Sequence, residues 1–106
     1  IEAQSALQEQ ALIKYEAAIL TALEDVENAL VAYGEEQIRR DSLQEAAQAV
    51  QKAVELAKYK YQSGLTDFYN VLEAERSLLT IQELLVQSNG TVGSNLVRLY
   101  KALGGG

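Results

Sequence analysis

The sequence contains no proline, cysteine, histidine, methionine or tryptophan. Because proline is the strongest helix breaker, its absence from a chain rich in Leu, Ala, Glu, Gln and Lys favours helix throughout. Without cysteine the chain can form neither a disulfide framework nor a thiolate metal site. Without histidine it lacks the commonest metal ligand and the commonest general base near neutral pH. We therefore expect an all-α protein that has no metal or other cofactor and is not an enzyme.

The charge and the hydropathy of the chain exclude two further classes of partner. The net charge of −6 argues against binding nucleic acid through neutralised phosphates. No apolar run reaches the ~20 residues that a helix needs to span a bilayer. The chain begins at Ile1 rather than at methionine. We expect it to be a piece of a longer protein.

The first part of the chain carries two blocks of apolar residues with the three-four spacing of a coiled-coil seam. These blocks are Leu12, Tyr15, Ile19, Leu23, Val26, Leu30 and Tyr33, and then Leu43, Ala47, Val50, Val54, Ala57 and Tyr61. The ten-residue step between them indicates a three-residue phase change, with Gly34 at that point. Either one helix continues through Gly34 with a slight kink, or the helix breaks there.

The second part of the chain has an apolar residue at every seventh position. This line consists of Val71, Leu78, Leu85, Val92 and Leu99, and the intervening core positions are Glu75, Gln82 and Asn89, followed by Leu96 and Leu103. The three polar residues lie either at the edge of a wide apolar stripe or against a wet space between two neighbouring helices. Two antiparallel helices cannot bury both stripes, so we predict self-association or a missing remainder of the protein.

A compact stop-and-restart signal separates the two patterns. Gly64 can take the left-handed conformation that ends a helix, and Leu65 then falls where it can pack back onto Tyr59. Thr66 or Asp67 can accept a hydrogen bond from the first amides of the next helix. The sequence thus predicts a long, coiled-coil-like antiparallel hairpin. Residues 1–106 form a single segment, with a helix over about 1–62, a tip turn over 63–66 and a helix over about 67–103.

Beyond the turn, Glu73 and Arg76 are the charged pair closest to the tip that could have a function. They stand three residues apart and can pair across a helix surface. The ordinary interpretation is a solvated salt bridge worth a few tenths of a kcal/mol. We find no phosphate-binding loop, no nucleophile with its base and no basic patch with aromatic residues.

Three stretches of the chain resemble the TolC-like outer membrane efflux proteins. Gly64, Leu65 and Asp67, followed by the stretch from Val71 to Leu78, are similar to the periplasmic tip of that family. Residues 22–30 resemble one of the long helices of that family. Residues 99–106 resemble the end of its conserved region in the branch that serves resistance–nodulation–division pumps. The resemblance covers nearly the whole chain but only the last quarter of such a protein.

The resemblance implies a homotrimer whose hairpins form a hollow α-barrel in the periplasm of a Gram-negative cell, as part of an outer membrane protein. Solutes expelled by an inner-membrane pump would pass along this tube. Ser63, Gly64 and Leu65 would be the tip motif on which a periplasmic adaptor docks its own helical hairpin. Glu73 stands where the family usually has an Asp that contributes to an acidic ring at the closed aperture. Arg76 stands where the same branch of the family has an Arg that helps to hold the aperture closed.

This sequence departs from the family pattern at two positions near the tip. Glu73 keeps the charge of the usual Asp but has a longer side chain, and Asn70 stands where some relatives carry a second acid. The alternative function is a soluble coiled-coil interaction module that dimerises into a four-helix bundle. A related alternative is the helical hairpin of the adaptor itself, whose tip motif differs from the turn at Gly64 and Leu65.

Overall fold

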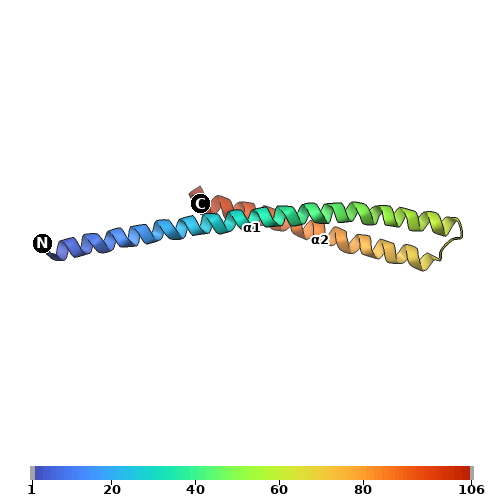
Figure 1. The fold of residues 1–106 in the computed structure, drawn as a ribbon, viewed down its shortest axis with the longest axis horizontal. Coiled ribbons are helices and arrows are strands. Elements are labelled where there is room, and N and C mark those ends of the chain that lie inside the picture. Colours follow the sequence, from blue (N-terminus) through green and yellow to red (C-terminus); the bar gives the residue numbers. More distant parts are fainter. Residues whose placement is uncertain (1, 106) are drawn as a thin grey trace. The chain divides into compact units, whose positions relative to one another are not determined.

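The computed structural model describes residues 2–105, and all of its regular elements are helices. Helix α1 spans Glu2–Gln62, helix α2 spans Phe68–Tyr100, and a short π-helical turn, η1, spans Lys101–Gly105 (Figure 1). No strand occurs within residues 2–105. The prediction of an all-α chain with a long helical hairpin is confirmed.

The chain divides into two compact units. One unit, called here the tip hairpin, is Gly34–Ser94 and contains the end of α1, the turn and most of α2. Its two helical arms run side by side in opposite directions (Figure 1). The other, called the terminal unit, joins the start of α1 up to Tyr33 with the chain from Asn95 onward.

The α2 arm of the tip hairpin turns two lines of residues toward the other arm. The expected line is confirmed, since Val71 is 2 % exposed, Leu78 and Leu85 are half-buried, and Val92 is buried. The second line is Ala74, Ile81 and Ser88, all buried or half-buried. The positions predicted for it, Glu75, Gln82 and Asn89, are each one residue further on and are exposed. One residue turns a helix by ~100°, so these side chains border the core, which agrees with the interpretation that they lie at the edge of the apolar stripe.

The α1 arm of the tip hairpin shows why the sequence indicated a phase change. One line of its buried and half-buried residues keeps an unbroken three-four spacing, and this line consists of Glu36, Arg40, Leu43, Ala47, Val50, Val54 and Ala57. Glu36 and Arg40, the first two residues of this line, are polar. A repeat of apolar residues alone therefore does not include them. In the terminal unit, Ala29 is 0 % exposed where Leu30 was expected in the seam. The predicted phase change is therefore wrong, and α1 continues through Gly34 without a break.

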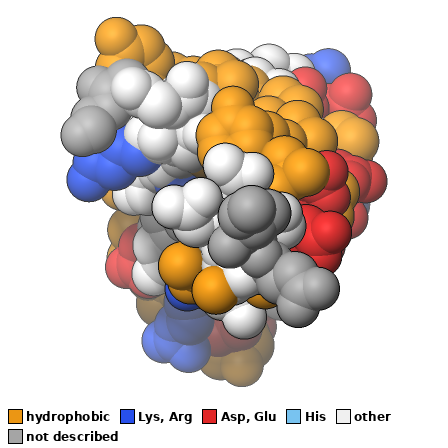
Figure 2. All heavy atoms as spheres, turned by 90° about the vertical axis from the view of Figure 1, so that its left-hand side faces the viewer, with side chains coloured by type: hydrophobic (Ala, Val, Ile, Leu, Met, Phe, Trp, Pro, Cys, Tyr) orange, Lys and Arg blue, Asp and Glu red, His pale blue; other side chains and the backbone are white. Residues whose placement is uncertain are grey.

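The terminal unit buries little of its apolar surface. Asn95 donates its side-chain amide to the Ala32 carbonyl at 3.2 Å, next to the fully buried Ala29. By contrast Tyr15 is 65 % exposed and Leu23 is 60 % exposed. Figure 2 views the chain from its N-terminal side and shows hydrophobic side chains at the surface there, beside acidic ones. Among the described residues, no helix is long and apolar enough to cross a membrane.

Candidate docking tip and aperture residues

Helix α1 ends in a Schellman motif centred on Gly64. The Leu65 amide donates to the Lys60 carbonyl at 2.8 Å, and the Gly64 amide donates to the Tyr61 carbonyl at 3.0 Å. This pair of bonds satisfies carbonyls that the helix end would otherwise leave free. Gly64 adopts φ 75°, a conformation that costs an L-residue with a Cβ roughly 1–2 kcal/mol. The predicted glycine-terminated helix end is present in the structure.

Helix α2 begins at a side-chain cap on Asp67. Its Oδ1 accepts a hydrogen bond from the Asn70 amide at 3.3 Å, so Asp67 is the N-cap residue of the two that the sequence offered. The other, Thr66, accepts a hydrogen bond from the Asn70 side-chain amide through its hydroxyl oxygen. The Schellman motif at the end of α1 and the Asp67 cap at the start of α2 each join residues that are close in the chain. Together they reverse the chain within a few residues.

The tip presents apolar side chains to solvent. Leu65 is 73 % exposed and Tyr59 is 65 % exposed, so the predicted packing of one on the other does not bury either. The contact at the tip is instead between the rings of Tyr61 and Phe68, whose centroids lie 5.2 Å apart. Ser63 and Gly64 are exposed as well. The three residues predicted to dock an adaptor therefore lie together on an accessible surface.

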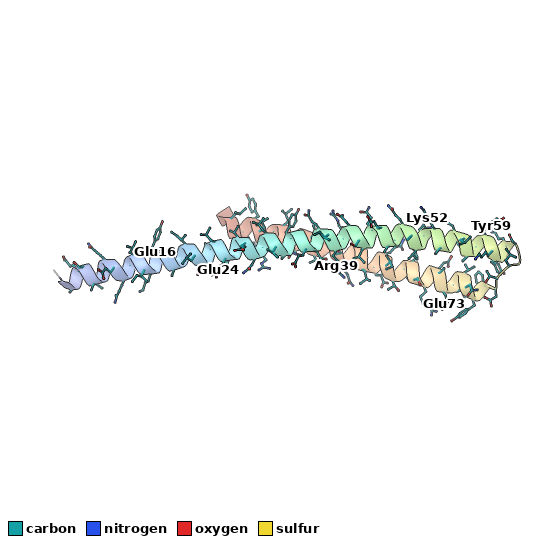
Figure 3. The ribbon with its side chains drawn as sticks, viewed as in Figure 1. Glu16, Glu24, Arg39, Lys52, Tyr59 and Glu73 are labelled. Carbon is teal, nitrogen blue, oxygen red and sulfur yellow. The ribbon has the colours of Figure 1, made fainter. Side chains whose placement is uncertain are left out.

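Glu73 and Arg76 form an ion pair along the surface of α2. Arg76 Nη1 lies 3.4 Å from Glu73 Oε1, and the Arg76 side chain is 76 % exposed. Figure 3 labels Glu73 on α2 near the tip, and Tyr59 on α1. Within one chain, such an exposed pair contributes little to stability. Its two charges remain available to groups outside this hairpin.

A second ion pair lies near the tip and joins the two arms. Lys58 Nζ on α1 lies 3.4 Å from Glu75 Oε1 on α2. The side chains are 54 % and 46 % exposed, so solvent screens the pair. This contact was not predicted from the sequence, because its two residues lie on different arms of the hairpin.

A polar contact inside the tip hairpin was also not predicted from the sequence. Ser88 Oγ on α2 donates to Glu36 Oε1 on α1 at 2.7 Å, and Arg39 Nη1 donates to the same oxygen at 3.0 Å. The hydrogen bond from Ser88 lowers the pKa of the Glu36 carboxyl. Burial opposes this shift, while the hydrogen bond and the charge of Arg39 add to it. A signal existed in the sequence, since Ser88 follows Ile81 by one heptad.

The described residues contain no group of three or more Asp and Glu side chains placed to hold a metal ion. The accessible chemistry of the tip hairpin consists of apolar and aromatic side chains around the turn, and of charged pairs beside it. Aromatic side chains are enriched at protein–protein interfaces.

The fold and the tip define a helical hairpin of the coiled-coil type with an exposed, capped turn. A family model described as "Outer membrane efflux protein" matches residues 1–105. The chain belongs to the outer membrane efflux protein family. This agrees with the predicted TolC-like identity, and with the prediction of a periplasmic part of an outer membrane protein.

Three relatives illustrate the range of the family. The chain is 37 % identical over 101 residues to the pyoverdine export outer membrane protein OpmQ of Pseudomonas aeruginosa. The aligned residues are 95 % of this chain and 21 % of OpmQ. It is 32 % identical to the cation efflux system protein CusC of Escherichia coli over 99 residues, which are 93 % of this chain and 22 % of CusC. It is 33 % identical to the probable efflux pump outer membrane protein TtgC of Pseudomonas putida over 93 residues, which are 88 % of this chain and 19 % of TtgC.

The chain thus spans about a fifth of the length of the curated relatives it matches. No solved structure matches it significantly.

Proposed function

We propose that this hairpin forms part of the periplasmic wall of an efflux duct, in a homotrimer whose hairpins together make a hollow α-barrel. The observation that carries the proposal is the match of the outer membrane efflux family over residues 1–105. Exposed apolar side chains on both units support it, because they require partners that this segment lacks. The family favours this function over a soluble coiled-coil module.

The tip turn is the proposed docking site for a periplasmic adaptor. Ser63, Gly64 and Leu65 are exposed at the end of the hairpin, and the Schellman motif holds them in one backbone conformation. A preformed turn loses little conformational entropy on binding. The partner would be a helical hairpin of the adaptor, and an inner-membrane pump would supply the solute.

Replacing Leu65 by Ser in the full-length protein tests the docking proposal. We expect weaker binding of the cognate adaptor and reduced export, with normal assembly in the outer membrane. Ile38→Ser is the matched control, because Ile38 is 69 % exposed on α1 and Leu65 is 73 % exposed. Equal adaptor affinity for the Leu65 variant and the unaltered protein would refute docking at this turn.

Glu73 and Arg76 are the proposed latch of the closed aperture. In a trimer, three copies of each charge would face one another at the tip, where each can exchange its partner within the chain for one on a neighbour. Adaptor docking at Gly64 and Leu65 would bias the aperture toward opening. Glu73 has a longer side chain than the usual Asp, which extends the reach of this contact.

Single-channel conductance of the full-length protein tests the latch. Replacing both Glu73 and Arg76 by Ala should raise the conductance of the channel. Lys58 and Glu75 offer a matched control, since they form an ion pair of the same 3.4 Å length near the same end of the hairpin. An unchanged conductance in the Glu73 and Arg76 variant, or the same increase in the control, would remove the gating role.

The exported solute is set by the pump in this proposal. The names of the three relatives refer to pyoverdine export, to cation efflux and to an efflux pump. Each relative nevertheless aligns with nearly the whole chain. A duct that passes on what the pump supplies is compatible with that variety. That the chain is not an enzyme also stays a prediction, and the efflux family supports it.

A further inference from the structure

Glu36 and Ser88 lie on the faces along which the two arms of the tip hairpin pack against each other. Among the described side chains, Ser88 is the one buried polar residue, and it is 0 % exposed. It stands one heptad after Ile81, where an apolar residue would be expected. Glu36 occupies the equivalent kind of position on α1, with its side chain 15 % exposed. A carboxylate and a hydroxyl thus meet across the arms in place of an apolar contact.

The contact is specific to one alignment of the arms. If one arm slid by a heptad along the other, Glu36 would face the region of Ile81 for one direction of the slide, and Ser88 would face that of Leu43 for the opposite direction. Each polar group would then lose its partner while it stayed largely shielded from water, which is costly. A polar pair in the seam between two helices is a known device for fixing the register of coiled coils. The tip turn fixes the register at the other end of the same unit.

We propose that Glu36 and Ser88 form a pH-sensitive lock on the register of the tip hairpin, which is closed while Glu36 is ionised and released when Glu36 is protonated. This lock does not depend on adaptor docking or on the aperture latch. Ionised Glu36 accepts two hydrogen bonds at one oxygen, from Ser88 at 2.7 Å and from Arg39 at 3.0 Å. Protonation removes the charge that strengthens both bonds.

Several charged groups lie near the lock, and Glu36 is the carboxylate among them that bonds across the two arms. On α1, the titratable neighbours within one turn are Tyr33, Glu35, Arg39 and Arg40, and Arg40 pairs with Asp41 at 3.1 Å. On α2, the residues within one turn of Ser88 carry no charge, and Glu83 and Arg98 are the first charged residues on either side. Arginine stays protonated at all accessible pH values. The response to pH therefore depends on a carboxyl, and Glu36 is the one that contacts both arms.

The direction of the pH effect follows from the pKa of Glu36. Its carboxyl has a lowered pKa in the folded chain, chiefly because Ser88 donates a hydrogen bond to it. A group with a lowered folded pKa stabilises the fold above its unfolded pKa, and that contribution is lost as the pH falls through the folded value. The lock should therefore be closed at neutral pH, and it should open progressively as the pH falls below the ordinary glutamate value of about 4.3 toward the lowered folded pKa.

Native-state hydrogen exchange of the full-length protein, at about pH 7 and about pH 3.5, tests the lock. After correction for intrinsic exchange rates, amides in 34–43 and 84–92 should lose about threefold to tenfold of their protection at the lower pH. Glu36→Gln should show the lower protection at both pH values. Ser88→Ala should lose protection at neutral pH and show a smaller response to acid. The control is Glu45→Gln, which removes an exposed carboxylate from the same helix and should behave like the unaltered protein.

Two results would overturn the proposal. One is a pH response in Glu36→Gln as large as that of the unaltered protein, which would assign the titration to another group. The other is full protection of Ser88→Ala at neutral pH with an unchanged acid response, which would assign the effect to the Arg39 pair alone.

Discussion

The rings of Tyr61 and Phe68 lie 5.2 Å apart at an interplanar angle of 55°, and so join the last turn of α1 to the first turn of α2. Each residue stands beside one of the two caps that reverse the chain. The ring contact therefore supplements the backbone bonds at Gly64 and the side-chain cap at Asp67.

Loss of the aromatic pair should loosen the tip. Tilted aromatic pairs contribute about 0.5–1.5 kcal/mol beyond their buried area. We expect Phe68→Ala to lower the local free energy of opening at the tip by about 1 kcal/mol, as measured by hydrogen exchange of the amides in 61–72. Phe68→Leu keeps most of the apolar area and removes the ring, and so separates the two contributions. An equal loss in both variants would assign the effect to the ring contact.

Gly64 should be sensitive to any side chain. Gly64→Ala places a Cβ on a residue with φ 75°, and we expect it to destabilise the end of α1 by about 1–2 kcal/mol. Apart from its two chain neighbours, no atom lies within 4 Å of the added Cβ, so the cost comes from the backbone alone. Gly90→Ala is the control, because Gly90 is helical and equally uncrowded. That variant should stabilise α2 by about 0.4–1 kcal/mol in the same exchange experiment.

The N-cap at Asp67 gives a second local prediction. Asp67→Ala removes the acceptor for the Asn70 amide and should cost about 1 kcal/mol at the start of α2. Asp67→Asn keeps an acceptor oxygen and should retain most of the stability. Faster exchange of the Asn70 amide in the Ala variant, and not in the Asn variant, would verify the cap. Equal exchange in all three proteins would show that the hydrogen bond contributes nothing.

The buried valines of the tip hairpin should dominate its stability. Val71 is 2 % exposed, and its truncation to Ala removes two buried carbon atoms at about 0.8 kcal/mol each, together with a further cost for the cavity. We expect a loss of about 2 kcal/mol in the free energy of unfolding of this unit, measured by exchange in denaturant. Val86→Ala is the control on the same helix, since Val86 is 70 % exposed. Its effect should stay within about 0.5 kcal/mol, and a larger one would mean that Val86 is covered in the assembled protein.

The tip was predictable because its chemistry is local. A glycine that can take positive φ and an Asp ahead of the next helix identify the turn in any all-α chain, and Gly64 and Asp67 have these roles in the structure. The seam was less predictable. Apolar periodicity selects the larger of two neighbouring hydrophobic residues, and so it favoured Leu30 over Ala29. Close helix packing favours the smaller one, which is fully buried.

Hydrophobic periodicity marks the position of Ser88, one heptad after Ile81, but it does not identify the polar partner of that residue. Glu36 and Ser88 look like surface residues, and their roles depend on a partner 52 residues away in the chain. Only the pairing of the two arms brings a hydroxyl to a carboxylate. The ion pair between Lys58 and Glu75 also joins residues on different arms, so it could not be predicted from the pattern of either arm alone.

The unbroken three-four spacing on the α1 arm and the heptad line on the α2 arm also restrict how this hairpin can change in length. Removing one residue from an arm would rotate every later side chain by ~100° and turn the buried face outward. Removing seven residues from both arms would restore the facing positions, because seven residues complete almost two turns. Viable length variants of the hairpin should therefore differ by whole heptads taken equally from its two arms. Insertions and deletions of other sizes should be confined to the turn.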